Sequence, residues 1–163
     1  MERAAPTPEP TQRLPSEARG YFVIGSLLWT VPLLVAGLAG TAALDGAGLP
    51  GWAAWSLRAL VVAVAVAGSA AVPMIRWRTW RYEVRPEELD LLRGVLVVTR
   101  TLIPMARVQH VDTERNPLAD LFDLRIVTVH TAAGSHDIPA LRPGEAVAIR
   151  DRIAQLARMP DDV

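Results

Sequence analysis

The residues best suited to acid–base or metal chemistry are His110, Asp112 and Glu114. At this i, i+2, i+4 spacing on a strand, the three side chains project from one face of a sheet. His130 and the pair His136–Asp137 could approach from neighbouring strands, and three such ligands suffice for a catalytic zinc site. A strand that is exposed on one face carries polar residues there without any metal. The sequence therefore favours a solvated face over a metal site.

Other catalytic signatures are absent from the sequence. Ser135 does not stand in a Gly-x-Ser-x-Gly turn, so the nucleophile elbow of a hydrolase is missing. The chain has no glycine-rich phosphate loop and no dinucleotide fingerprint. It has no Cys, which excludes disulfides, zinc–thiolate sites and cysteine nucleophiles. We therefore expect a protein that is not an enzyme, with no cofactor and no small-molecule substrate.

Charge and apolar residues are distributed unevenly along the 163 residues. The 17 basic and 17 acidic residues cancel, so the chain as a whole offers no bulk attraction for nucleic acid. Apolar residues concentrate between Tyr21 and Ile75, without the polar stripe that a soluble helix usually shows. The first half of the chain therefore predicts a membrane anchor, and the second half predicts a soluble domain.

Two transmembrane helices are expected, at about residues 21–44 and 54–75. The first segment contains no charged residue and would be about 36 Å long as a helix, enough to cross a bilayer. A glycine-rich turn at residues 45–51 separates it from the second. Small residues at 68–71 suit close packing of the second helix on the first. A cleaved signal peptide is the alternative for the first segment, although the segment is long for a signal and a second apolar segment follows it.

A collar of arginines and tryptophans follows the second apolar segment. It supplies the candidates for contact with the membrane interface and with lipid, namely Arg76, Trp77, Arg78, Trp80 and Arg81. Tryptophan is enriched at membrane interfaces, and each Arg near an anionic leaflet contributes on the order of 1 kcal/mol. Anchoring alone explains such a collar. Selection of lipid headgroups by the adjoining domain is the functional alternative.

Arginines near the helix ends predict the orientation in the membrane. The connecting turn is followed by a single arginine, Arg58, whereas arginines gather before the first helix and after the second: Arg3, Arg13, Arg19, Arg76, Arg78, Arg81 and Arg85. The positive-inside tendency then places both termini of a multi-pass cell-membrane protein in the cytoplasm. Residues 1–20, rich in Pro and charge, are expected to form a disordered cytoplasmic tail.

From residue 79 the pattern becomes that of short strands. Alternating or β-branched runs, each followed by a turn signal, predict six strands, at residues 80–84, 88–92, 95–103, 107–114, 124–131 and 136–138. Strands of this number and spacing argue for a sandwich or barrel that occupies residues 79–158.

Two helices interrupt the strand pattern. Asn116 followed by Pro117 predicts the N-cap and first residue of a short helix that extends to residue 123. A second helix begins at Pro143, and its apolar residues recur at the helical period: Ala146, Ile149, Ile153 and Leu156. Such a terminal amphipathic helix is expected to cap one end of the barrel. Residues 159–163 are expected to form a short tail.

The order of these elements resembles a known family. The phrases Trp80–Val84, Arg93–Val95 and Arg107–Val111, with Ile103-Pro104 and Asn116-Pro117-Leu118, are similar to the YdbS-like family of membrane-anchored bacterial pleckstrin-homology (PH) domain proteins. The resemblance implies a PH-like fold, in which two crossed antiparallel sheets are closed by a C-terminal helix. It implies no reaction, and it supplies no catalytic residue or established ligand.

Together these features predict an α+β membrane protein, with a two-helix transmembrane hairpin followed by a PH-like β barrel or sandwich and a C-terminal capping helix. We expect a membrane-anchored binding or scaffold module at the cytoplasmic face. It would engage a protein partner or assemble with copies of itself, since Val95–Val98 could support pairing at an open sheet edge. The alternative is a domain that senses anionic lipid. The expected partners are the lipid bilayer and protein.

Overall fold

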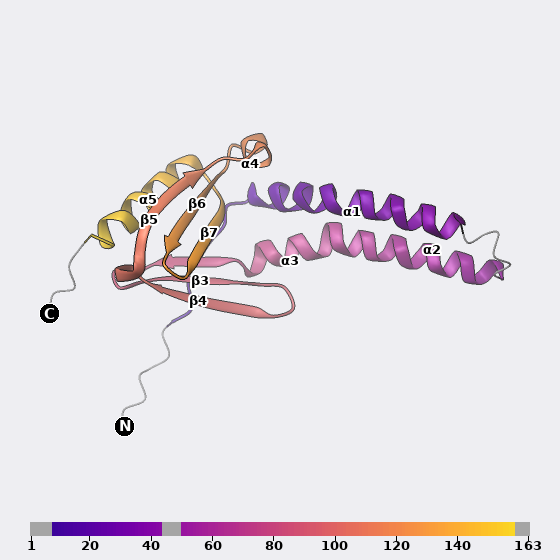
Figure 1. Ribbon diagram of the computed structural model, residues 1–163, viewed down its shortest axis with the longest axis horizontal. Coiled ribbons are helices and arrows are strands. Elements are labelled where there is room, and N and C mark those ends of the chain that lie inside the picture. The colour runs from indigo at the N-terminus through magenta and orange to yellow at the C-terminus, as the bar shows by residue number, and fades with distance from the viewer. Residues whose placement is uncertain (1–7, 44–49, 159–163) are drawn as a thin grey trace, which may run out of the picture.

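The computed structural model describes residues 8–43 and 50–158, which form a helical hairpin joined to a two-sheet domain (Figure 1). Helix α1 (Ala18–Ala43) runs beside a second helical segment made of α2 (Gly51–Val66), the π-helical turn η2 (Ala67–Ala71) and α3 (Val72–Thr79). Spans of 26 and 29 residues are about 39 and 44 Å long, enough to cross a bilayer. These are two candidate membrane spans.

Both helices extend beyond the predicted ranges of 21–44 and 54–75. Helix α1 begins three residues earlier, because the backbone turns at Pro15–Glu17 and its amides bond back to those carbonyls. Helix α2 begins at Gly51 directly after Pro50, which takes the N-cap position. Helix α3 continues to Thr79 and ends where Trp80 adopts an extended conformation. Residues 44–49 of the predicted turn lie outside the described residues.

Small residues hold the two helical segments close together, as predicted. At Gly37, an added Cβ would lie 2.8 Å from the Val61 side chain, so only glycine permits this approach. The small-residue surface at residues 68–71 also faces α1, since an added Cβ on Gly68 would lie 3.2 Å from Thr30. The helices therefore pack along most of their length.

The π-helical turn η2 lies just before Pro73. Because proline has no N–H, Pro73 cannot bond to the Ser69 carbonyl one helical turn earlier. The hydroxyl of Ser26 on α1 lies 3.2 Å from that carbonyl and 2.7 Å from the carbonyl of Val23, so one proton serves both oxygens. The Val72 amide bonds to the Ala67 carbonyl, five residues back. The proline thus explains the local change of winding, and α1 supplies the missing donor.

The soluble domain consists of two antiparallel sheets. One has the order β1-β2-β3-β4, with strands Gln12–Arg13, Arg81–Val84, Glu88–Gly94 and Val98–Pro104. The other has the order β5-β6-β7, with strands Val108–Glu114, Arg125–Thr131 and Gly134–Leu141. A short 3-10 turn, η3 (Met105–Arg107), leads from β4 to β5. Among the described residues no strand pairing joins the two sheets, so of the two predicted alternatives, barrel or sandwich, the structure has the sandwich.

The predicted strand at residues 95–103 is shorter than expected. Residues 95–97 form the bend of the β3–β4 hairpin instead of the start of a strand. The chain bends after Gly94, which has a φ of 150° that side-chain-bearing residues rarely adopt. An added Cβ on Gly94 would lie only 2.0 Å from the Val97 carbonyl oxygen, so the bend requires glycine at this position. The last predicted strand is longer than expected, because β7 extends to Leu141.

Both predicted helices of the soluble domain are present. The Asn116 side chain accepts a hydrogen bond of 2.7 Å from the Ala119 amide and so caps α4 (Pro117–Leu121). Helix α5 (Pro143–Leu156) packs on the β5–β6–β7 sheet and buries Ala146 and Ile153 completely. The predicted apolar face of this helix is therefore confirmed.

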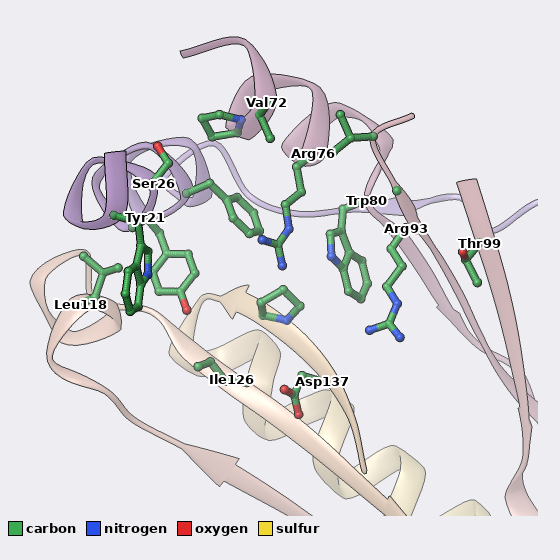
Figure 2. A pocket seen from close by; sticks show the side chains of 17 residues that line it. Tyr21, Ser26, Val72, Arg76, Trp80, Arg93, Thr99, Leu118, Ile126 and Asp137 are labelled. Carbon is green, nitrogen blue, oxygen red and sulfur yellow. The ribbon is translucent and has the colours of Figure 1, made fainter. Parts of the chain in front are cut away.

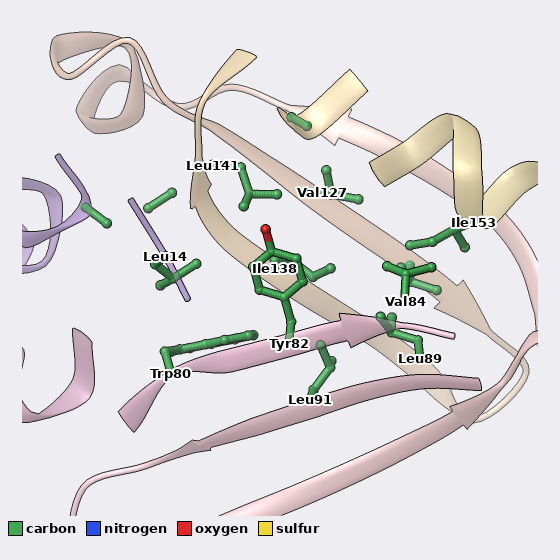
Figure 3. Close-up of a cluster of buried hydrophobic side chains, with 14 of the residues drawn as sticks. Leu14, Trp80, Tyr82, Val84, Leu89, Leu91, Val127, Ile138, Leu141 and Ile153 are labelled. Atoms are coloured by element: carbon green, nitrogen blue, oxygen red, sulfur yellow. The ribbon is translucent and has the colours of Figure 1, made fainter. Parts of the chain in front are cut away.

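The core lies between the two sheets and α5 (Figure 3). Its fully buried members come from both halves of the sandwich: Trp80, Leu89 and Leu91 from one side, and Val127, Ile138 and Ile153 from the other. The core also includes Leu14, which lies just before α1, and Ala18, the first residue of α1.

The expectation of a disordered tail over residues 1–20 is wrong for the part that the structure describes. Residues Gln12–Arg13 pair with Tyr82 and Arg81 of β2, and Leu14 is only 3% exposed. The Glu17 carboxylate lies 2.9 Å from the guanidinium of Arg142 at the start of α5. Hydrogen bonds to its backbone and to Arg142 lower the pKa of Glu17. Leu14 offers an apolar anchor that composition alone did not reveal. Residues 1–7 and 159–163 lie outside the described residues.

Tyr82 provides a test of this packing at high pH. Burial, together with the nearby Glu145 carboxylate, raises the pKa of the Tyr82 phenol to about 12. A raised pKa means that the neutral phenol stabilises the fold below the ordinary pKa of 10, and that this stability is lost as the pH rises toward 12. We expect absorbance at the tyrosinate band to show a component that titrates near pH 12 in folded protein and is missing from the Tyr82→Phe variant. A component near pH 10 that this substitution removes would contradict the burial.

Candidate functional site

A cavity of about 720 Å³ lies where the helical hairpin meets the soluble domain (Figure 2). This volume falls within the usual range for ligand sites. One wall comes from α1, and a second comes from α3 and the residue that follows it. The β3–β4 hairpin forms a third, and α4, β6 and β7 complete the enclosure. The lining residues on which the chemistry depends are Tyr21, Phe22, Trp29, Val72, Arg76, Trp80, Arg93 and Asp137.

The cavity has an apolar part and a charged part. The guanidinium groups of Arg76 and Arg93 and the carboxylate of Asp137 all extend into the space between the walls (Figure 2). Arg76 also lies over the ring of Phe22, with its guanidinium carbon 5.1 Å from the ring centroid. Neither arginine forms an ion pair with any residue that the structure describes. An anionic group could therefore enter without first displacing an internal partner.

Several contacts fix the walls of this cavity. The hydroxyl of Thr79, at the end of α3, donates a hydrogen bond to the Gly94 carbonyl and so holds the β3–β4 hairpin beside α3. Leu118 of α4 packs against Gly25 of α1, where an added Cβ would lie 3.3 Å away. The Tyr21 hydroxyl lies 3.5 Å from the side-chain nitrogen of Asn116. Both the hairpin and α4 are thereby placed against the helices.

The residues of the predicted arginine and tryptophan collar lie in different environments in the structure. Arg76 and Arg78 are both exposed, but only Arg76 lines the cavity, while Arg81 lies on β2 at 3.9 Å from Glu9. Trp77 is half-buried, and its indole N–H donates a 3.0 Å hydrogen bond to the Pro15 carbonyl. Trp80 is only 2% exposed, which corrects its assignment to the membrane interface. It packs in the domain core and shows an edge to the cavity, because the chain has already left the helix at this residue.

Arg93 and Asp137 are cavity residues that the sequence did not single out. In the sequence, Arg93 stands out only within the phrase Arg93–Val95 that resembles a known family, and Asp137 only as a candidate metal ligand from a neighbouring strand. They come together with Arg76 because three separate segments meet at the junction of helices and sheets. No local sequence signal reports such a meeting.

Only some of the predicted metal-ligand candidates lie close together. Asp112 Oδ2 lies 3.5 Å from His110 Nε2 and 3.4 Å from His130 Nε2, and these three residues form the one candidate cluster of metal ligands among the described residues. Glu114, His136 and Asp137 do not join it. The two imidazole rings stack at 4.2 Å with an interplanar angle of 11°. A metal ion lies near the plane of each imidazole that binds it, so the rings would have to turn to share one ion.

The sandwich has an open edge at β4. One edge of β4 pairs with β3 along the whole strand. Within residues 8–43 and 50–158, no strand pairs with the other edge of β4. Exposed aliphatic side chains gather on this strand and on the hairpin bend before it: Leu96, Val97, Val98 and Leu102. An unprotected strand edge beside aliphatic side chains is a template for pairing with another chain.

Comparison with known proteins gives two relatives and a family. The family model described as "Bacterial PH domain" matches residues 22–157. The UPF0699 transmembrane protein YdbS of Bacillus subtilis (strain 168) is 43% identical over 113 residues, which are 69% of this chain and 71% of that protein. The UPF0699 transmembrane protein YdbT of the same strain is 25% identical over 85 residues, which are 52% of this chain and 17% of that protein. No solved structure matches the chain. None of these descriptions names an enzymatic activity.

Proposed function

Since the chain belongs to the bacterial PH domain family, we propose that it acts as a membrane-anchored binding module at the inner face of the cell membrane. The observation that carries this proposal is the open edge of β4 on an anchored domain. In this function β4 accepts a β-strand from a second chain that carries a domain of the same family. Backbone hydrogen bonds then supply the attraction, and alternate side chains supply the selectivity.

The relatives support a partner of the same kind. One bacterium has a relative that this chain matches over most of its length, and a second, several times longer, of which the match covers only 17%. Short and long members can therefore occur together. A domain that recognises its own fold by edge pairing serves equally for a pair of identical chains and for a short chain with a long one.

The orientation follows from the charges at the two ends of the hairpin. Arg19 and Arg76 lie at the end that carries the domain, together with the exposed Arg78, whereas Arg58 lies near the start of α2. We place the domain and both termini in the cytoplasm on this basis. Pairing of β1 with β2 supports the same arrangement, because it requires the segment before α1 and the segment after α3 to share one side of the membrane.

Because the chain has no native cysteine, crosslinking from a single introduced thiol tests this function. The variant Leu102→Cys places a thiol on β4, and Val147→Cys on α5 is its matched control, since the two native side chains are 44% and 45% exposed. We expect a reagent that carries one maleimide and one photoreactive benzophenone, applied to native membranes and then illuminated, to join Leu102→Cys to a second family chain far more than Val147→Cys. Mass spectrometry of the product identifies the chain. Monomers only, or equal yields from the two variants, would contradict edge pairing.

A further inference from the structure

We infer that the cavity between the helices and the domain binds a membrane phospholipid, with the lipid phosphate held between Arg76 and Arg93. This site goes beyond the proposed function: Thr99 of β4 lines the cavity, but its charged groups come from α3, β3 and β7 and not from β4. The ligand class follows from the depth, the polarity and the charge of the cavity.

The depth of the cavity matches the border between hydrocarbon and headgroups. Arg76 is the first charged residue after the apolar run 59–75, so its guanidinium marks the height at which a spanning helix leaves the hydrocarbon. On the opposite wall, the lining residues of α1 extend from Tyr21 to Trp29, a rise of about 12 Å. The cavity therefore begins at headgroup level and continues along the helices toward the hydrocarbon.

The distribution of polar groups matches an amphiphile. Toward the membrane the walls are formed by Trp29 and Val72, which can accept an acyl chain, while Phe22 lies beside the Arg76 guanidinium. Trp29 is 78% exposed in the structure, so this side of the cavity is open to the surrounding lipid. Toward the domain the walls carry Arg76, Arg93 and Asp137 (Figure 2). A soluble anion would use only the charged end of this space, whereas a phospholipid fills both ends.

The charge of the site matches a phosphodiester whose headgroup also carries hydrogen-bond donors. Two guanidinium groups and one carboxylate sum to +1, the complement of the single negative charge on a phosphodiester. Guanidinium groups bind phosphate oxygens through parallel, charge-assisted hydrogen bonds. Asp137 lies beside them as an acceptor for the hydroxyls of a headgroup such as that of phosphatidylglycerol. A bare phosphomonoester would leave Asp137 facing additional negative charge.

The test measures binding of phosphatidylglycerol to the full chain. Delipidated protein in detergent is titrated with dioleoyl-phosphatidylglycerol, and native mass spectrometry gives the fraction of protein with bound lipid. Loss of one charge-assisted hydrogen-bonding group weakens binding by roughly ten- to a hundredfold. We expect a loss of this size in Arg93→Gln and in Arg76→Gln. Arg78→Gln, two residues beyond Arg76 and outside the cavity lining, is the matched control and is expected to bind like the unmodified chain.

Two further measurements test whether the bound phosphate belongs to a lipid or to a soluble molecule, and whether the variants are folded. Glycerol 3-phosphate at millimolar concentration is expected not to displace the lipid, because it cannot occupy the apolar end. Far-ultraviolet circular dichroism of each variant confirms that the sheets are intact. Equal weakening by Arg78→Gln would show attraction to the collar as a whole and overturn the site, as would unchanged binding in Arg76→Gln and Arg93→Gln. Full displacement by glycerol 3-phosphate would overturn the lipid and leave a site for soluble phosphate. None of these outcomes depends on β4 pairing.

Discussion

The variant Trp80→Ala is expected to lose about 3–5 kcal/mol of the free energy of unfolding of the soluble domain, the usual cost of removing a fully buried large aromatic side chain. Trp80 is 2% exposed and is among the largest side chains buried in the core. Its removal leaves a void between the β1–β4 sheet and the cavity that the surrounding strands cannot fill. A loss of this size approaches the whole stability of many small domains.

Urea unfolding of the detergent-solubilised full chain, followed by near-ultraviolet circular dichroism, measures this loss. Trp55→Ala is the matched control, because Trp55 lies at the far end of the hairpin and is 71% exposed. It should leave the midpoint of domain unfolding unchanged, since surface substitutions usually stay within about 0.5 kcal/mol. If both variants unfolded at the same urea concentration, Trp80 would belong to the membrane interface and not to the core.

The variant Asp90→Ala is expected to destabilise the same domain by about 3 kcal/mol, the lower end of the cost of breaking a buried ion pair. Asp90 is fully buried, and its carboxylate accepts hydrogen bonds from Arg100 at 2.6 and 3.0 Å. Arg85 approaches the same carboxylate at 3.5 Å. Without it, Arg100 loses this carboxylate, while Arg85 keeps its contacts with the carboxylates of Glu83 and Glu88, at 3.4 and 3.3 Å.

The loss is also expected to loosen the N-terminal segment. Arg85 and Arg100 each donate a hydrogen bond to the Pro8 carbonyl, at 2.7 and 2.8 Å, so Asp90 positions both donors that hold this segment on the sheet. Limited proteolysis should therefore cut near residue 8 faster in Asp90→Ala. Asp151→Ala, at an exposed carboxylate paired with Arg150, is the matched control. Similar unfolding midpoints and cutting rates in the two variants would show that the Asp90 network contributes little.

Local patterns in the sequence were sufficient for much of the fold. The Asn116 cap, the apolar face of α5 and the two apolar helices each depend on residues a few positions apart, so periodicity and capping chemistry predict them. The resemblance to bacterial PH domain proteins, carried by short phrases spread over most of the chain, is confirmed by the family match.

What the sequence did not predict depends on contacts between distant segments. Leu14 looks like one apolar residue in a proline-rich leader, and only its place beside the sheets makes it part of the core. Trp80 continues a pattern of interfacial residues, yet the helix ends at Thr79 and turns the indole into the domain. The charged end of the cavity combines Arg76 with Arg93 and Asp137, residues whose proximity only the packing of helices against sheets creates.

The pairing of β1 with β2 has a consequence for biosynthesis. Gln12 leaves the ribosome 70 residues before its partner Tyr82, and both hydrophobic helices are made in between. At about 5–20 residues per second the early strand waits roughly 4–14 seconds for a template. In the membrane arrangement proposed above, insertion of the hairpin during that interval must return the growing chain to the side of the membrane where the strand was left. In that arrangement, a chain whose N-terminal segment had been exported could not pair β1 with β2, because the two strands would lie on opposite sides of the bilayer.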